Sequence, residues 1–85
     1  MIEVFTKPGC GQCFGLELYL KRHEVPAVFH DVSEDLVARE RMVEMGYSQV
    51  PVVRNTETGE HWYGFDAARL ELSIQGVPAA AALQE

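Results

Sequence analysis

The sequence lacks the features that mark several large classes of protein. Lys and Arg are scarce, at 7 of 85 residues against 13 Asp and Glu, and the formal net charge is −6. Because nucleic-acid phosphates demand a basic surface, binding to DNA or RNA is not expected. No apolar run approaches the roughly 20 residues that span a bilayer, so no membrane segment is expected. Repeats and low-complexity tracts are absent apart from the alanines at 79–82.

Cysteine is also scarce, and its placement is informative. The chain has only two cysteines, Cys10 and Cys13, separated by Gly11 and Gln12. Met1 leads straight into a short apolar run rather than into a basic segment followed by a long apolar one, so we expect no signal peptide and a cytoplasmic location. Structural disulfides are rare in that compartment, where a C-x-x-C pair is more often catalytic or metal-binding.

Apolar periodicity predicts a single α/β domain over residues 1–78, followed by a tail over 79–85 that is helical or frayed. Runs of β-branched and aromatic residues favour strands, and apolar residues at helical spacing favour helices. The expected order is β-α-β-α-β-β-α, with strands at 2–6, 27–32, 51–54 and 60–63 and helices at about 11–23, 34–45 and 67–75.

Local signals mark the ends of the three predicted helices. Val25-Pro26 should stop the first helix, because the residue before a proline avoids the helical region. Asp31 or Ser33 is expected to cap the second helix. The side chains that should face inward from it are Leu36, Val37, Met42 and Val43. Asp66 is expected to cap the third helix, and Gly76-Val77-Pro78 to end it.

The lengths of the connections predict how the strands pair. The first two strands are joined by a crossover helix and should therefore be parallel. The last two are joined by the loop at 55–59, which suits an antiparallel hairpin. The chain is therefore expected to form a four-stranded mixed sheet with helices on both faces.

The cysteine pair at the start of the first helix predicts a thiol–disulfide redox centre. Residues three apart at a helix start lie on one face, within disulfide reach. Cys10 would lie at the helix N-terminus, where free N–H groups, the macrodipole and Lys7 favour a thiolate, and we assign it as the attacking nucleophile. Cys13 would resolve the mixed disulfide. Gly11 removes bulk beside the reacting sulfur, after the turn Lys7-Pro8-Gly9.

Two other interpretations of the pair stay open. A zinc site would need two further ligands. The only histidines, His23, His30 and His61, do not stand at metal-ligand spacing from either cysteine. In the third interpretation the pair is chemically inert. The redox interpretation needs no bound cofactor and no metal.

The segment Trp62-Tyr63-Gly64-Phe65 concentrates aromatic residues close to the third helix. Aromatic residues on a short strand usually belong to the core, and Phe65 is expected to pack under the third helix. Two interpretations stay open for Trp62. It is half buried in the core, or it belongs to an apolar patch around Cys10 that docks a partner protein.

Taken in order, these motifs resemble those of the NrdH-type redoxins, which are glutaredoxin-like proteins with the thioredoxin fold. The resemblance spans nearly all of residues 1–75. The matching segments are Phe5-Thr6-Lys7-Pro8, Cys10-Gly11-Gln12-Cys13, Gly46-Tyr47, Val50-Pro51-Val52-Val53 and His61-Trp62-Tyr63-Gly64-Phe65. Gln12 and the last of these segments are its most specific parts.

The resemblance implies an activity and a set of partners. Members of that family are thiol–disulfide oxidoreductases that take electrons from NADPH through thioredoxin reductase and pass them to the disulfide of class Ib ribonucleotide reductase. Cys10 and Cys13 would be the redox pair. Pro51 would be cis and face the disulfide, with the backbone of Val50 open to an extended partner. The alternative is a trans Pro51 that begins an edge strand. A monomer suits such a carrier.

The resemblance also separates this chain from glutathione-using glutaredoxins. Trp62 to Phe65 would take the place of a glutathione-binding segment, and Phe65 stands where a glycine would let the tripeptide approach. A glutaredoxin that works with glutathione or another small thiol remains an alternative, as does a metal- or cluster-binding module. Gly11, Phe14 and Tyr63 differ from the residues usual in NrdH proteins, which leaves the exact reductase and substrate open.

Overall fold

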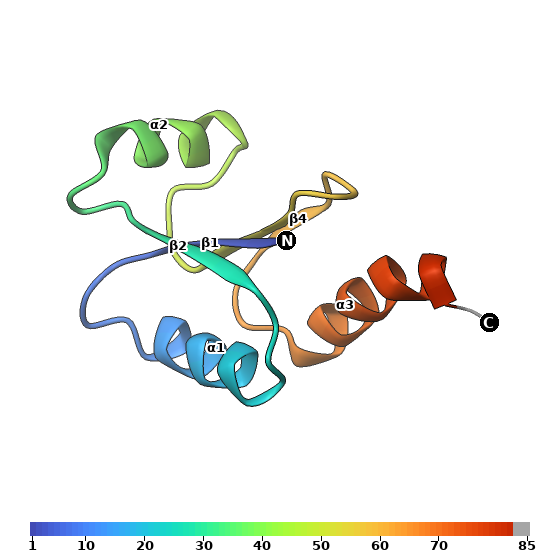
Figure 1. Ribbon diagram of the computed structural model, residues 1–85. Helices are drawn as coiled ribbons and strands as arrows, with labels where there is room; N and C mark the ends of the chain where they lie inside the picture. Colours follow the sequence, from blue (N-terminus) through green and yellow to red (C-terminus); the bar gives the residue numbers. More distant parts are fainter. Residues whose placement is uncertain (83–85) are drawn as a thin grey trace.

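The computed structural model describes the backbone of residues 1–82 and the side chains of residues 1–74. Its elements follow the predicted order (Figure 1). They are β1 (Ile2–Thr6), α1 (Gly11–Arg22), β2 (Ala27–Asp31), α2 (Leu36–Glu44), β3 (Val52–Asn55), β4 (His61–Tyr63) and α3 (Ala67–Ala82).

The four strands form one mixed sheet in the order β2-β1-β3-β4. Strands β1 and β2 are parallel, whereas β1 and β3 and also β3 and β4 are antiparallel. Helices α1 and α3 cover one face of the sheet, and α2 covers the other (Figure 1). The predicted mixed sheet, its pairing and its helices on both faces are therefore confirmed, and the arrangement is the thioredoxin/glutaredoxin fold.

Alternation along the central strands divides the apolar core into two clusters. Ile2 and Val4 of β1 pack with α1 and with Val53 of β3. Phe5 of β1 and Val52 of β3 face the opposite way and pack with α2. Because successive side chains of a strand point to opposite faces, two short strands supply apolar surface to both layers of helices.

The second helix differs from its prediction. It begins at Leu36 rather than at residue 34, and Asp35 caps it by accepting the N–H of Ala38 at 3.0 Å. Asp31 instead accepts the N–H of Ser33 at 2.9 Å, so neither of the expected caps starts this helix. Both of them are used in the turn that follows β2, which leaves the next aspartate to satisfy the helix N-terminus.

The inward face of α2 is also narrower than the sequence suggested. Of the four apolar residues expected to face inward only Met42 does, together with Ala38. These two residues lie four positions apart and share one stripe of the helix. The residues that face solvent instead are Leu36, Val37 and Val43.

The third helix is longer than predicted. Asp66 accepts the N–H of Arg69 at 3.0 Å, as expected of its cap. The helix continues to Ala82, so Gly76-Val77-Pro78 does not end it, and the expected boundary at residue 78 falls within α3. Alanine has the highest helix propensity, and the alanines at 79–82 favour continuation past the proline. Residues 83–85 of the expected tail lie outside the described residues.

A buried charge cluster, which was not predicted from the sequence, joins the sheet to α2. Glu3 of β1 is 10% exposed at its side chain and accepts hydrogen bonds from His30 of β2 at 2.8 Å and from Arg41 of α2 at 3.0 Å. Arg54 of β3 lies 3.4 Å from the same carboxylate. Burial disfavours the charged form, but the hydrogen bonds and charges of Arg41 and His30 outweigh it and hold the pKa of Glu3 below its ordinary value of 4.5.

Substitution of Glu3 tests this cluster. Glu3→Gln leaves two cations without their carboxylate and should lower the free energy of unfolding by about 1–3 kcal/mol at neutral pH. The pKa is depressed in the folded state, so this stabilisation is fully present above the ordinary value and is lost as the pH falls from there through the lower folded-state pKa. Urea unfolding should therefore separate the two proteins at pH 7 and bring them together toward roughly pH 3.

A matched control is Glu40→Gln, which removes an exposed carboxylate from α2. It should leave the free energy of unfolding within about 0.5 kcal/mol of the parent. A Glu3→Gln protein as stable as the parent at pH 7, or one with the same deficit at both pH values, would contradict the role given to the cluster.

Candidate active site

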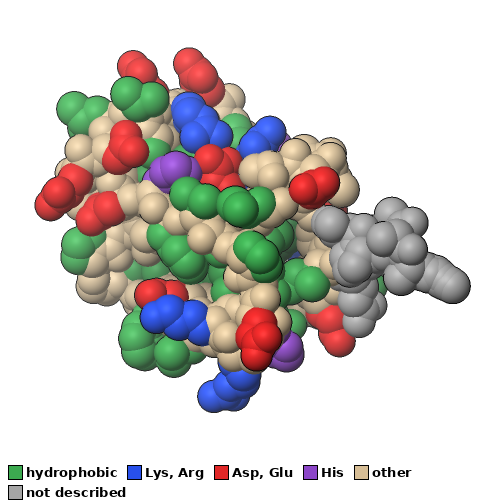
Figure 2. Space-filling model, in the orientation of Figure 1, with side chains coloured by type: hydrophobic (Ala, Val, Ile, Leu, Met, Phe, Trp, Pro, Cys, Tyr) green, Lys and Arg blue, Asp and Glu red, His purple; other side chains and the backbone are tan. Residues whose placement is uncertain are grey.

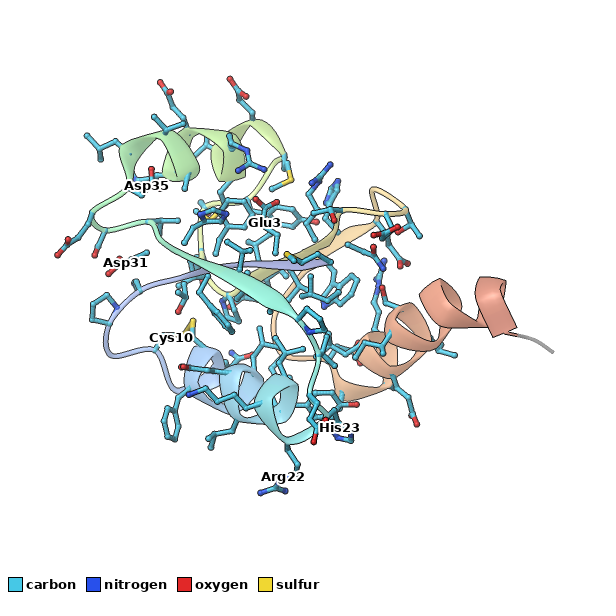
Figure 3. The ribbon with its side chains drawn as sticks, viewed as in Figure 1. Glu3, Cys10, Arg22, His23, Asp31 and Asp35 are labelled. Carbon is cyan, nitrogen blue, oxygen red and sulfur yellow. A yellow bond between two sulfur atoms is a disulfide. The ribbon has the colours of Figure 1, made fainter. Side chains whose placement is uncertain are left out.

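The two cysteines form a disulfide at the N-terminus of α1. Cys10 is the N-cap residue, with extended backbone angles, and its Sγ accepts the N–H of Cys13 at 3.1 Å. The two Cα atoms lie 5.2 Å apart, within the usual range for a disulfide. Figure 3 shows Cys10 at the end of α1 that lies next to the sheet. The sequence prediction that both cysteines share one turn is confirmed.

The two cysteines differ in their access to solvent. Cys13 is 5% exposed and belongs to the cluster that contains Phe5, Val50 and Val52. Cys10 is only partly buried and packs against the edge of that cluster. A partner's sulfur therefore reaches Cys10 more easily than Cys13, which fits the assignment of Cys10 as the group that meets the partner.

The turn before the disulfide keeps its surroundings electropositive. Lys7, Pro8 and Gly9 are all exposed, and the first turn of α1 holds no acidic residue. Lys7 forms no ion pair within the described part of the chain. In the reduced protein, the free N–H groups of the helix start and the positive charge of Lys7 would both favour a thiolate at Cys10.

Gly11 leaves open space next to the reacting sulfur. A Cβ built on this residue would meet no atom within 4 Å. The fold itself therefore does not require glycine here. This space remains open to a molecule that approaches Cys10.

Gln12 connects the cysteine motif to the aromatic segment that the sequence singled out. Its Oε1 accepts the backbone N–H of Phe65 at 3.2 Å. Gly64 next to it has φ of +96°, a conformation that side chains other than glycine rarely adopt, and its N–H donates to the carbonyl of Pro51 at 2.8 Å. The two most specific parts of the sequence resemblance are therefore in direct contact.

The Val50–Pro51 peptide bond is cis, as expected. Val50 packs in the same apolar cluster as Cys13, at whose edge Cys10 lies, so the fold brings residue 50 to the disulfide. Its backbone N–H and C=O have no hydrogen-bond partner among the residues that the structure describes. Pro51 itself is buried.

Trp62 does not belong to an exposed patch. It is 5% exposed and packs in the core cluster with residues of β1, β3 and α1. The guanidinium of Arg69 lies 4.9 Å from the centroid of its ring system. The docking interpretation of Trp62 is therefore wrong. The Trp62 side chain lies on the face of the sheet that α1 and α3 cover.

Phe65 packs against the core cluster that contains Leu70 of α3, where the sequence predicted it, and also on α1. Its ring carbons lie 3.4 Å from the position that a Cβ on Gly15 would take, and its centroid lies 5.8 Å from that of Tyr19. A Cβ at residue 15 would be in van der Waals contact with the ring, so Gly15 marks the place where Phe65 meets α1. Gly15 was not among the predicted site residues, although a glycine inside a helix can signal close packing of this kind.

A shallow pocket next to residue 50 was also missed. It has a volume of about 240 Å³ and is lined by Gly46, Tyr47, Ser48, Gln49 and Tyr63. Tyr63 is half exposed at its rim, and its hydroxyl lies 3.4 Å from the side-chain oxygen of Gln49. The antiparallel pairing of β3 and β4, which places Tyr63 opposite Val52, brings these residues together.

The described residues form neither a metal-binding cluster nor a membrane-spanning helix. Over the described residues, no group of three or more His, Cys, Asp or Glu side chains is arranged to hold a metal ion. Within the same residues, no helix has the length and apolar composition needed to cross a membrane.

A C-x-x-C disulfide at a helix start on this fold defines a thiol–disulfide oxidoreductase of the thioredoxin superfamily. Residues 2–61 match the model of the glutaredoxin family. This match covers more than half of the chain, so the protein belongs to the glutaredoxin family. No curated protein matches the chain.

Solved structures with the same fold include two kinds of redoxin. The thioredoxin-like protein BC3987 is 31% identical, with a TM-score of 0.78 over 86% of this chain and 99% of that one. A point mutant of it is 29% identical, with a TM-score of 0.79 over 87% and 99%. The NrdH-redoxin from Escherichia coli is 22% identical, with a TM-score of 0.75 over 84% and 91%. The last likeness bears on the fold alone.

The contact between Gln12 and Phe65 gives a local prediction. Gln12→Ala removes the acceptor of the Phe65 amide, and a hydrogen bond of this kind contributes about 0.5–1.5 kcal/mol. The Phe65 amide should therefore exchange with deuterium about 2- to 12-fold faster, as measured by NMR.

Gln12→Glu keeps the acceptor oxygen and serves as the matched control, so its Phe65 amide should exchange at close to the parent rate. Equal exchange in all three proteins would mean that Gln12 does not hold the segment.

Proposed function

We propose that this protein is an NrdH-type dithiol redoxin. It takes electrons from NADPH through thioredoxin reductase and delivers them to a protein disulfide, with class Ib ribonucleotide reductase as the candidate acceptor. It acts as a monomer in the cytoplasm and carries no bound cofactor, since the Cys10–Cys13 pair alone stores the two electrons. The pairing of a partly exposed Cys10 with a buried Cys13 supports this proposal.

The proposed reaction has two exchange steps. In the reduced protein, the Cys10 thiolate attacks one sulfur of the partner disulfide, forms a mixed disulfide and releases the partner's other sulfur as a thiolate, which takes up a proton. The Cys13 thiolate then attacks the Cys10 sulfur and releases the partner's second thiolate. Two electrons have moved to the partner, and the Cys10–Cys13 disulfide of the present structure has formed.

The neighbouring residues have supporting roles in this scheme. Lys7, in the turn with Pro8, and the helix start stabilise the Cys10 thiolate, and the backbone N–H of Cys13 already points at the Cys10 sulfur. Gly11 leaves room for the partner. The partner's chain would run in extended form past residue 50 and pair with its free N–H and C=O groups.

The hydrogen bond from Phe65 to Gln12 is the single observation that favours a protein partner over glutathione. A glutathione carboxylate would need free donors at this end of α3, and the N–H of Phe65 is already used. Gly64 and Phe65 therefore offer no free backbone N–H group that could bind an anion next to the cysteines.

A second candidate function is a glutaredoxin that works with glutathione. The match of residues 2–61 to the glutaredoxin family is the observation that favours it. This function would need only Cys10, because a single thiol suffices to remove glutathione from a mixed disulfide.

Coupled assays separate the two candidates. NADPH oxidation is followed with the purified protein, thioredoxin reductase and a protein disulfide, and in parallel with glutathione, glutathione reductase and a glutathionylated peptide. We expect turnover with thioredoxin reductase and at least tenfold less with glutathione. The opposite preference would overturn the proposal in favour of a glutathione-dependent glutaredoxin.

Cysteine variants test the assigned roles in the same assay. Cys10→Ser should abolish turnover because no nucleophile remains. Cys13→Ser should stop turnover on protein disulfides and accumulate a mixed disulfide with the partner, visible by mass spectrometry. A Cys13→Ser protein that still turns over protein disulfides at the parent rate would contradict the two-step scheme.

A further inference from the structure

The exposed face of α1 carries apolar side chains that start at the reacting sulfur. Phe14 is 62% exposed and Leu18 is 46% exposed. Cys10, Phe14 and Leu18 are spaced four residues apart and so follow one face of the helix. Phe14 therefore lies one helical turn from Cys10 on the same face, and Leu18 lies one turn farther on. We call these three residues the α1 stripe.

The ends of the stripe are basic in a protein that is otherwise acidic. Lys7 precedes it, and Lys21 and Arg22 form the last turn of α1. Residues 7–24 carry three Lys and Arg residues against two acidic residues, Glu17 and Glu24, whereas the whole chain has 7 Lys and Arg against 13 Asp and Glu. In Figure 2 acidic side chains are numerous in the upper part of the molecule, around α2, whereas hydrophobic, basic and a few acidic side chains lie together at the lower edge, over α1.

The basic charges at the far end are available to a partner. Lys21 pairs with Glu17 at 3.4 Å, but both side chains are largely exposed, and such surface pairs contribute little. Arg22 forms no ion pair with any residue whose side chain the structure describes. Figure 3 shows Cys10 and Arg22 at opposite ends of α1. They are 12 positions apart, which corresponds to about 18 Å along a helix.

We infer that the α1 stripe docks the protein whose disulfide Cys10 attacks, and that this partner presents apolar side chains next to its cysteine and carboxylates farther along the chain. The inference rests on the proposed redox function and names the chemistry of its protein partner. Charge complementarity points to carboxylates, since the basic end of α1 would repel a basic segment. In an extended chain at about 3.3 Å per residue, apolar contacts fall two to four residues from the cysteine and carboxylates five or six residues from it.

Activated peptides test this inference directly. Fifteen-residue peptides with one central cysteine are converted to mixed disulfides with 5-thio-2-nitrobenzoate. The Cys10 thiolate attacks the peptide sulfur and releases the coloured thiolate, and Cys13 then releases the reduced peptide. The three peptides carry, on both sides of the cysteine, apolar residues with distal carboxylates, apolar residues with distal lysines, or only polar uncharged residues. We expect the first peptide to react about tenfold faster than the third.

Two variants assign this preference to the stripe. Phe14→Ser should remove most of the advantage of apolar peptides, and Arg22→Gln should reduce the preference for carboxylates over lysines by about threefold. The charge preference, but not the apolar preference, should weaken between low and high salt. Both variants should react with the small disulfide 5,5′-dithiobis(2-nitrobenzoate) at the parent rate, because it does not reach along the helix.

Matched controls lie on α2, on the opposite face of the sheet. Leu36→Ser removes a side chain that is 69% exposed, and Arg39→Gln removes an exposed cation. Neither should change any rate. Equal rates for the three peptides, or a Phe14→Ser variant that slows the small disulfide as much as the peptides, would overturn the inference. Failure to react with the small disulfide and with every peptide would overturn the proposed redox function as well.

Discussion

The site depends on how the first turn of α1 is held. Leu16 and Leu20, farther along the helix, pack in the cluster on one face of the sheet. Cys13 packs instead in the cluster on the other face, with Phe5 and Val50. The start of α1 therefore reaches over the end of β1 and is fixed by both apolar clusters at once. This constraint buries Cys13 and leaves Cys10, the N-cap residue, as the sulfur that a partner can reach.

The other segments around the disulfide are linked to that first turn by hydrogen bonds. Gln12 holds the backbone of Phe65, and Gly64 donates to the carbonyl of Pro51. The hairpin of β3 and β4 thus places residue 50 on one side of the disulfide and the aromatic segment on another. Since β3 is a central strand and pairs with β1, the geometry of the site follows from the register of the sheet. A one-residue slip of β3 would point Val52 away from the cysteine cluster.

The sequence predicted the parts of this arrangement that local chemistry determines. The strand and helix order, the parallel and antiparallel pairs, the position of the disulfide and the Asp66 cap follow from periodicity, connection lengths and capping residues. The burial of Trp62 and the packing of Phe65 on α1 did not follow. They depend on which neighbours the fold supplies, such as Gly15 on α1, and an aromatic pattern on a short strand does not distinguish its two faces.

The charge cluster of Glu3 and the inward face of α2 were missed for the same reason. Each joins residues from distant parts of the chain, and an acidic residue within a strand or an apolar residue on a helix gives no sign of its partners. The cap of α2 was a local error, since the turn after β2 uses both expected caps, Asp31 and Ser33, and Asp35 starts the helix instead.

The most direct measurement is which sulfur of the reduced protein reacts first. The protein is treated with less than one equivalent of iodoacetamide at neutral pH, and fragment-ion mass spectrometry identifies the modified residue. The structure predicts carbamidomethylation at Cys10, with Cys13 protected by the cluster of Phe5 and Val50. Modification mainly at Cys13, or equally at both cysteines, would contradict the assignment of Cys10 as the nucleophile.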